Sequence, residues 1–168
     1  MRLAHLPALA ALCLAGCTST PVRDGAMATY LIVRHAEKDV RVADDPPLTA
    51  EGQARAERLA ALLADTPLDA IYSSPTRRTR QTAAPVARAK GLDIADYDPA
   101  DATGFAARLH RDHPRGTVLV VGHSNTVPQL ARALCACEVP DMDEAVYGIR
   151  YTVRFDTAGN PRLSGTRD

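Results

Sequence analysis

Three short polar clusters contain residue types that bind and transfer phosphoryl groups. The clusters are Arg34-His35, the segment Ser73 to Gln81, and Gly122-His123-Ser124. The guanidinium group of an arginine matches phosphate oxygens in a bidentate fork and stays charged at any relevant pH. A histidine held beside such arginines can act as a nucleophile, and a second histidine can neutralise charge on the phosphoryl oxygens. These residues predict a phosphoryl-binding pocket that needs no metal ion and no cofactor.

Each cluster follows an apolar run that is typical of a buried strand. The runs span residues 28–33, 70–72 and 117–121, and such runs bounded by turn or charge signals favour strands. In an open sheet of parallel strands, ligands bind outside the carboxyl ends of the strands. If these three strands are parallel, the clusters meet at one edge of the sheet.

Helical patterns lie between the predicted strands. They span residues 50–64, 76–90, 104–112 and 128–135, with Thr49 as an N-cap of the first and Gly91 as the stop of the second. Pro85 inside the second pattern predicts a kink or a later start. Further strands are expected at 92–94, 149–155 and 162–164, and the last two are joined by a hairpin loop at 156–160. Alternating strands and helices predict an α/β fold, a three-layer α/β/α sandwich with a mostly parallel sheet and an antiparallel C-terminal edge.

The composition argues against a nucleic-acid partner. The chain of 168 residues has 20 Lys plus Arg and 20 Asp plus Glu, so it carries no overall basic charge. Trp is absent and aromatic residues make up only 4%, which leaves few side chains for stacking on bases. Hydrophobic residues make up 46%, and this content at this length supports one folded domain with its own core.

The first 16 residues have the pattern of an export signal. Arg2 is followed by an apolar stretch from Leu3 to Leu14, which is shorter than the roughly 20 residues of a membrane-spanning helix and fits the apolar region of a signal peptide. The stretch ends in Leu-Ala-Gly-Cys at residues 14–17, which resembles the lipobox of bacterial lipoproteins. The resemblance implies cleavage before Cys17 and lipidation of this cysteine. An ordinary signal peptide and a translation start at Met27 are the alternatives.

The domain boundaries follow from this interpretation. We expect a lipoprotein signal peptide at residues 1–16, a lipidated tether at 17–26 and the folded domain at 27–168. Several acyl chains at Cys17 would anchor the protein stably to a membrane. The expected location is the bacterial cell envelope, facing the periplasm. Thr18 after the cysteine, in place of an aspartate, favours the outer membrane.

In their order along the chain, the three polar clusters resemble the signatures of the histidine phosphatase superfamily, which includes the phosphoglycerate mutases. Arg34-His35 resembles the first motif, Ser73 to Ala83 the second, and Gly122-His123-Ser124 the third. The resemblance covers roughly Thr29 to Phe155. The small size of the chain resembles the compact bacterial branch that includes the phosphohistidine phosphatases.

The resemblance implies a role for each matching residue. His35 matches the histidine that becomes phosphorylated, and Arg34 matches the first phosphate-binding arginine. In the second motif the phosphate-binding arginine precedes a small residue, any residue and then Gln-Thr, which selects Arg78. His123 matches the second histidine of the phosphate pocket.

Two departures from the family pattern concern the backbone after the nucleophile and the proton donor. Ala36 stands where the family usually has glycine, and its methyl group restricts the backbone there. Larger members carry a catalytic glutamate in a segment inserted after the second motif, whereas residues 91–104 contain aspartates but no glutamate. Glu37 lies near the nucleophile in sequence and is our candidate for the proton donor.

Two other groups of residues have plainer interpretations. His110 and His113 have a spacing that a metal pair could use, but no further ligand is spaced to join them, so a solvated helix face is expected. Cys135 and Cys137 are separated by one residue. Two packed thiols at a helix end are the default expectation, and an oxidising periplasm leaves a disulfide open.

These observations together predict a phosphatase that hydrolyses a phosphate monoester or phosphoramidate through a phosphohistidine intermediate on His35. The substrate is a phosphorylated small molecule or a phosphoprotein. A phosphomutase of the same family is one alternative, against which the short segment between the second and third motifs argues. A non-catalytic envelope lipoprotein that binds a phosphorylated component in the same pocket is the other.

Overall fold

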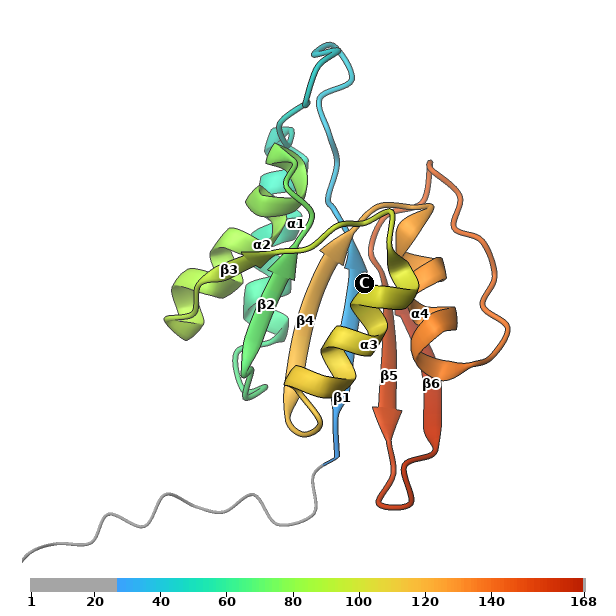
Figure 1. Ribbon diagram of the computed structural model, residues 1–168. Coiled ribbons are helices and arrows are strands. Elements are labelled where there is room, and N and C mark those ends of the chain that lie inside the picture. The colour runs from blue at the N-terminus through green and yellow to red at the C-terminus, as the bar shows by residue number, and fades with distance from the viewer. Residues whose placement is uncertain (1–26, 168) are drawn as a thin grey trace, which may run out of the picture.

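The computed structural model describes residues 27–167, and the predicted signal peptide and tether lie outside the described residues. The strands are β1 (Thr29–Arg34), β2 (Ala70–Ser73), β3 (Ile94–Asp96), β4 (Thr117–Gly122), β5 (Ile149–Phe155) and β6 (Pro161–Arg167). The helices are α1 (Ala50–Leu62), α2 (Arg77–Lys90), α3 (Ala102–Asp112) and α4 (Thr126–Cys135). Strands and helices alternate from β1 to α4, as the sequence pattern predicts (Figure 1).

The strands form one sheet in the order β3-β2-β4-β1-β5-β6. The strands β1 to β4 run parallel, whereas β5 pairs antiparallel with β1 and β6 pairs antiparallel with β5. Arg34 at the end of β1 is opposite Gly122 at the end of β4. This sheet confirms the predicted parallel arrangement with an antiparallel C-terminal edge, and it brings the carboxyl ends of β1, β2 and β4 to the same edge (Figure 1).

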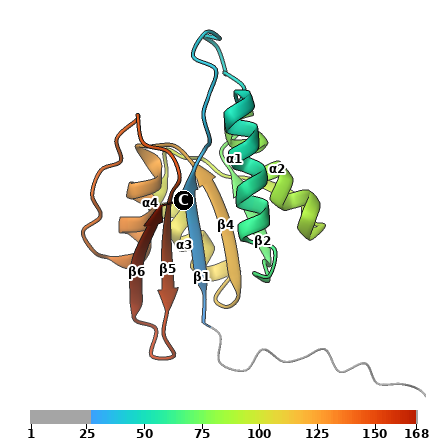
Figure 2. The same ribbon diagram turned by 180° about the vertical axis from the view of Figure 1, so that it is seen from behind.

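Helices cover both faces of the sheet, which gives the three predicted layers. α1 and α2 lie on one face, and α3 and α4 lie on the other (Figure 1, Figure 2). Tyr30 and Ile32 of β1 belong to the core under α3 and α4, while Leu31 and Val33 belong to the core under α1 and α2. A central parallel strand covered on both faces is apolar throughout, which explains the apolar run before Arg34. None of the described helices is long and apolar enough to cross a membrane.

Local signals determine the ends of α1 and α2. The side chain of Thr49 accepts the backbone N–H of Gly52 at 3.1 Å, which caps the start of α1. Gly91 ends α2 with φ 64°, a left-handed conformation that glycine adopts without steric cost. α2 begins at Arg77 and continues through Pro85, so the later start that this proline suggested is wrong.

α3 and α4 each begin two residues earlier than the sequence pattern predicts. Asp101 accepts the backbone N–H of Gly104 at 2.8 Å and caps α3 at its start. α4 begins at Thr126, so Pro128 lies in the first turn of the helix. Proline is tolerated there because the first turn lacks intrahelical partners for its N–H groups.

Cys135 and Cys137 form a disulfide, so the expectation of two packed free thiols is wrong. The two Cα atoms lie 5.1 Å apart, within the range that a disulfide spans. Ala136 between them ends α4 with φ 50°. The bond therefore closes the turn that connects α4 to the loop of residues 138–148.

His110 and His113 contact tyrosine side chains. His113 Nε2 lies 2.9 Å from the Tyr72 hydroxyl, and His110 Nδ1 lies 3.5 Å from the Tyr30 hydroxyl. His110 is exposed and His113 is half-buried, so the expected solvated helix face is only partly correct. Within residues 27–167 no group of three or more His, Cys, Asp or Glu side chains has the arrangement of a metal site.

Candidate active site

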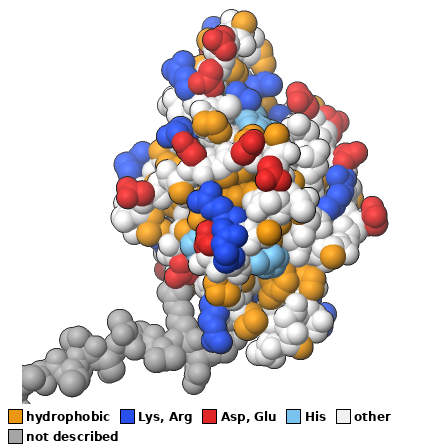
Figure 3. Space-filling view, in the orientation of Figure 1, with side chains coloured by type: hydrophobic (Ala, Val, Ile, Leu, Met, Phe, Trp, Pro, Cys, Tyr) orange, Lys and Arg blue, Asp and Glu red, His pale blue; other side chains and the backbone are white. Residues whose placement is uncertain are grey.

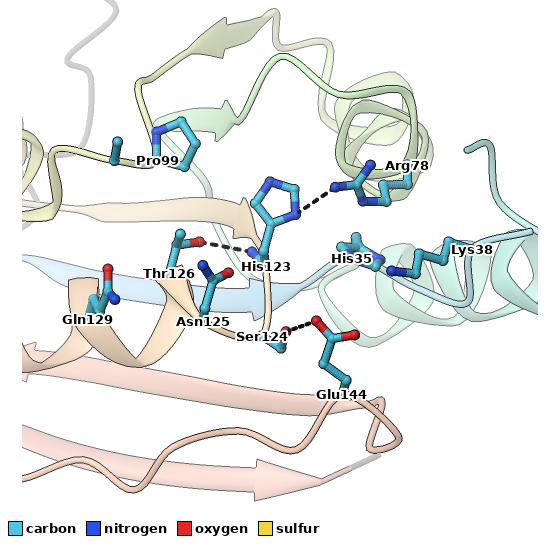
Figure 4. A pocket seen from close by; sticks show the side chains of 11 residues that line it. His35, Lys38, Arg78, Pro99, His123, Ser124, Asn125, Thr126, Gln129 and Glu144 are labelled. Carbon is cyan, nitrogen blue, oxygen red and sulfur yellow. Dashed lines mark hydrogen bonds between the residues drawn. The ribbon is translucent and has the colours of Figure 1, made fainter. Parts of the chain in front are cut away.

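A cavity of about 410 Å³ lies at the carboxyl ends of the parallel strands. His35 follows β1 directly, His123 follows β4 directly, and Arg78 comes from the first turn of α2. Figure 4 shows these three side chains around one space, with the first turn of α4 beside them. On the molecular surface, histidine side chains lie among basic side chains near the upper end of the molecule (Figure 3). The structure therefore brings together three of the residues that the sequence motifs predicted.

His35 is held neutral, with one ring nitrogen fixed. The side chain is 3% exposed, and Nδ1 donates a hydrogen bond to the carbonyl of Ala36 at 2.7 Å. Burial is the main cause that lowers the pKa of His35 to about 3, and neighbouring positive side chains lower it further against the effect of this hydrogen bond. With the proton on Nδ1, the lone pair of Nε2 is left for an incoming phosphorus atom.

His123 lies next to His35, with their ring centroids 5.5 Å apart. Its Nδ1 lies 3.4 Å from Arg78 Nη2. Because a guanidinium group can only donate hydrogen bonds, Nδ1 is the acceptor of this hydrogen bond. Its Nε2 then donates to the hydroxyl of the buried Ser74 at 2.9 Å. Burial, followed by the charge of Arg78, lowers the pKa of His123 to about 4. Both imidazoles are therefore neutral in the free protein at neutral pH.

Arg78 differs from the neighbouring arginines because it lines the cavity. Its side chain is 19% exposed, and its Nε is buried without a hydrogen-bond partner. Arg78 Nη1 also lies 3.8 Å from a carboxylate oxygen of Asp45. Arg80 does not line the cavity and forms an exposed ion pair with Asp96, and Arg77 is exposed. A buried unpaired donor costs about 1–3 kcal/mol, so this nitrogen suits an anionic acceptor such as a phosphoryl oxygen. The structure therefore supports the choice of Arg78 within the second motif.

Arg34 is buried beside the site but is not among the residues that line the cavity. Its Nη1 donates to three carbonyl groups of one loop, those of Asp143, Glu144 and Val146, at 3.2, 2.7 and 2.8 Å. Its guanidinium carbon lies 4.2 Å from the centre of the Tyr147 ring. The charge of Arg34 still lowers the pKa of both active-site histidines. The structure thus gives Arg34 a positioning role that the motif did not suggest, and direct phosphate binding by Arg34 stays a prediction.

Ala36 replaces the usual glycine without backbone strain. Among the described residues other than glycine, only Asp45 and Ala136 have a positive φ. The backbone N–H of Ala36 donates to Thr82 Oγ1 at 3.0 Å, and its carbonyl accepts from His35. The methyl group is therefore compatible with the geometry that fixes the nucleophile.

Glu37 does not fit the predicted role of proton donor. Its carboxylate accepts hydrogen bonds of 2.7–3.1 Å from Nε and Nη2 of Arg55, and it is not among the residues that line the cavity. Burial alone would raise the pKa of Glu37, but the hydrogen bonds and charge of Arg55 hold it below its ordinary value. A carboxylate held in the ionised form is a poor general acid. Arg55 lies on the following helix, so the spacing around His35 could not reveal this pair.

The motifs did not identify several other polar residues of the cavity wall, namely Lys38, Asn125, Thr126, Gln129 and Glu144. Asn125 and Gln129 are four residues apart, a spacing that places both on one face at the start of α4 (Figure 4). That spacing was a usable signal in the sequence. Glu144 lies in an irregular loop, and no periodic pattern points to it.

Comparison with known proteins agrees with this geometry. Residues 30–99 match the model of the histidine phosphatase superfamily (branch 1), a range that contains His35 and Arg78. The matched range is less than half of the chain and contains the first two of the three sequence motifs. His123 lies beyond the matched range and joins the site through the fold.

The curated relative phosphoserine phosphatase 1 of Hydrogenobacter thermophilus is 38% identical over 78 residues. The match covers 43% of this chain and 37% of that protein, so the chain spans little more than a third of the relative's length. The similarity covers too little of either protein to indicate a shared substrate.

Solved structures of phosphatases share the fold. The protein histidine phosphatase SixA complexed with tungstate has a TM-score of 0.69 at 23% identity, over 83% of this chain and 96% of that chain. A putative α-ribazole-5′-P phosphatase from Escherichia coli has a TM-score of 0.69 at 17% identity, over 86% of this chain and 97% of that chain. A mycobacterial glucosyl-3-phosphoglycerate phosphatase has a TM-score of 0.66 at 15% identity, over 83% of this chain and 97% of that chain. These likenesses establish the architecture of the domain.

Proposed function

We propose that this histidine phosphatase domain hydrolyses a phosphate monoester or phosphoramidate, with His35 as the nucleophile. The observation that carries the proposal is the neutral, buried His35, whose Nδ1 donates to Ala36 while Arg78 and His123 lie beside it. Nε2 attacks phosphorus, the bond to the leaving group breaks, and a phosphohistidine forms. Water then cleaves the P–N bond and releases phosphate.

Arg78 and His123 stabilise the phosphoryl group in this proposal. Arg78 presents a guanidinium with an unpaired buried Nε, which suits the charge on the equatorial oxygens during transfer. His123 is neutral in the free protein, and a neighbouring dianion favours its protonation. A protonated His123 can then donate to a phosphoryl oxygen.

The names of the relatives support a phosphorylated small molecule or a phosphoprotein as the substrate. They include a phosphoserine phosphatase, a glucosyl-3-phosphoglycerate phosphatase and a protein histidine phosphatase. The cavity of about 410 Å³ has the size of a small-molecule site. We favour hydrolysis over phosphomutase activity because only 11 residues, 91–101, lie between α2 and α3, which offers little chain to enclose a product.

The test is phosphate release from p-nitrophenyl phosphate, phosphoserine and a phosphohistidine peptide by the full chain and by a His35→Ala variant. We expect turnover of at least one compound by the wild type and its loss in the variant. A variant with the wild-type rate would contradict the mechanism. Transfer of phosphate within an ester, detected by product analysis, would favour a mutase, and binding of phosphate without any turnover would favour a binding protein.

We also propose that a lipid anchor at Cys17 holds the protein in the bacterial cell envelope, facing the periplasm at the outer membrane. The lipobox-like residues 14–17 support this proposal. The cavity lies beyond Arg34, at the opposite end of β1 from Thr29 (Figure 1). Six strand residues span about 20 Å, so a tether before Thr29 would direct the cavity away from the membrane. Cys17→Ala should release the protein into the soluble fraction, and persistent membrane association would contradict the anchor.

A further inference from the structure

We propose that Glu144 is the proton donor of this site, and that the site is therefore suited to phosphate esters of aliphatic alcohols. The inference rests on the proposed phosphatase function, since it concerns the leaving group of that reaction. Glu144 belongs to the loop between α4 and β5, far from the sequence motifs. It replaces Glu37, whose carboxylate is bound by Arg55.

The side chain of Glu144 lies in the wall of the cavity. Among the described residues 27–167, it is the only carboxylate that lines the cavity shared by His35 and His123. Ser124 Oγ donates to Glu144 Oε1 at 3.3 Å, and Figure 4 shows the carboxylate pointing from its loop toward Ser124 on the His35 side. Within the described part of the chain, none of the ion pairs involves Glu144. The carboxyl group is thus available to a substrate in the cavity.

Arg34 anchors the backbone of Glu144. Arg34 Nη1 donates to the carbonyl of Glu144 at 2.7 Å and to the nearby carbonyls of Asp143 and Val146. The ring of Tyr147 in the same loop lies against the Arg34 guanidinium. Because Arg34 directly precedes His35, one segment of β1 fixes both the nucleophile and the loop that carries the carboxyl group. This double attachment explains why Arg34 is buried although it does not line the cavity.

The other side chains of the cavity are less suited to this role. Amide and hydroxyl groups such as those of Asn125, Gln129 and Ser124 do not release a proton readily. In the proposed function His123 binds a phosphoryl oxygen, so its proton is held by that oxygen and not by the leaving group. A carboxylic acid gives up a proton more readily than the ammonium group of a lysine, and Lys38 is the lysine that lines the cavity. A carboxyl group is therefore the best general acid that this wall offers.

The proton transfers balance over the two steps. In the first step His35 Nε2 forms a bond to phosphorus, the P–O bond to the alcohol breaks, and the Glu144 carboxylic acid gives its proton to the departing alkoxide. In the second step the Glu144 carboxylate takes a proton from water as the water oxygen bonds to phosphorus and the P–N bond breaks. Phosphate, the alcohol and neutral His35 result, and Glu144 is again protonated.

The proposal implies a preference in the leaving group. An aliphatic alkoxide is strongly basic and leaves readily only when it is protonated during bond cleavage, whereas p-nitrophenolate leaves without this help. The hydroxyl and amide groups of Ser124, Asn125 and Gln129 beside Glu144 provide neutral hydrogen-bonding partners for an alcohol that carries further hydroxyl groups.

The test compares Glu144→Gln with a matched control, Glu138→Gln, in the full chain. Glu138 is an exposed glutamate of the same loop and does not line the cavity. The substrates are glycerol 2-phosphate, with an alcohol leaving group, and p-nitrophenyl phosphate. General acid catalysis contributes about 10²–10⁴-fold, so we expect Glu144→Gln to lose at least about 10²-fold in kcat/KM on the glycerol ester and to keep nearly wild-type kcat/KM on the nitrophenyl ester. We compare kcat/KM because it reports only the steps up to release of the leaving group, whereas kcat also contains the hydrolysis of the phosphohistidine, which both substrates share. Glu138→Gln should leave both rates unchanged.

The outcomes separate this proposal from the proposed function. Equal kcat/KM of Glu144→Gln and wild type on the glycerol ester, or equal losses of kcat/KM on both esters, would overturn the role of Glu144 while leaving the phosphatase in place. No turnover of either ester by the wild type, or full activity of His35→Ala, would overturn the phosphatase itself. Activity on p-nitrophenyl phosphate also shows that each variant is folded.

Discussion

His35 is surrounded by groups that oppose its protonation. Burial is the main cause that lowers its pKa to about 3, and burial with the charge of Arg78 lowers the pKa of His123 to about 4. An ordinary histidine titrates near pH 6.5. We therefore expect kcat/KM for p-nitrophenyl phosphate, whose leaving group needs no general acid, to stay level through pH 6–7 after correction for ionisation of the substrate and to fall only below about pH 4. Steady-state kinetics over a range of pH measures kcat/KM. A fall of kcat/KM with an apparent pKa near 6.5 would contradict the conclusion that His35 and His123 are buried and neutral.

The low pKa of His35 also makes the fold sensitive to acid. Between about pH 6.5 and pH 3 the unfolded chain binds a proton at this histidine and the folded chain does not. Because the unfolded state then binds more protons, the free energy of unfolding falls as the pH falls through this range. Replacement of His35 by Gln removes one such group and should flatten this dependence. Urea unfolding at several pH values measures it, and an unchanged slope would contradict the prediction.

Arg78 and Arg80 provide a matched pair of substitutions on one helix. Arg78→Ala removes the guanidinium that lines the cavity, and loss of one charge-stabilising donor in an active site costs about 10²–10³-fold in kcat. Arg80→Ala removes only an exposed ion pair with Asp96, so its kcat should match the wild type. Steady-state kinetics with p-nitrophenyl phosphate measures both. Equal effects of the two substitutions would contradict the assignment of Arg78.

At the scale of elements, the Glu37–Arg55 pair joins the segment after β1 to α1. Both side chains are largely buried, with 15% and 22% exposed, and the backbone carbonyl of Glu37 accepts from the N–H of Thr49 at 2.9 Å. Glu37→Gln should lower the free energy of unfolding by about 1–3 kcal/mol, the range for a hydrogen bond between charged groups. It should leave kcat on aliphatic esters close to the wild-type value. Chemical unfolding and kinetics measure the two quantities, and a large loss of kcat without loss of stability would restore Glu37 as a catalytic candidate.

The elements that carry the site could be predicted because their signals are local. The apolar run before Arg34, the cap at Thr49 and the stop at Gly91 each depend on residues within a few positions. Parallel strands then bring the polar residues that follow them to one edge. This placed His35, Arg78 and His123 together before any distance was known.

The remaining features depend on contacts between distant parts of the chain. Arg34 turns toward carbonyl groups more than 100 residues further along the chain, and Glu144 reaches the cavity because that loop is held there. The bond between Cys135 and Cys137 depends on the left-handed turn at Ala136, a conformation that alanine seldom adopts. Secondary-structure propensity and the spacing of residues in the sequence do not predict contacts between distant residues or an unusual turn of this kind.

At the scale of the whole molecule, one sheet edge carries the chemistry, while the core under each face supplies stability. Only the folded chain brings Arg78 and His123 to one cavity, so an anion held by both binds the folded state. Orthovanadate should therefore raise the free energy of unfolding, by about 2.7 kcal/mol at a concentration of 100 times its Kd. Thermal unfolding with and without the anion measures this. Arg78→Ala should lose most of the shift and Arg80→Ala should keep it, and a shift that is equal in both variants would place the anion elsewhere.

The proposed mechanism requires a phosphohistidine on His35, and this intermediate can be trapped and identified. Protein mixed with p-nitrophenyl phosphate and quenched in alkali, which preserves phosphohistidine, can be digested and the modified peptide identified by mass spectrometry. We predict a phosphoryl group on His35 in the wild type and none at any histidine in His35→Ala, which should also lose turnover. Turnover that continues in His35→Ala, or a phosphoryl group found on another residue of the wild type, would contradict the account.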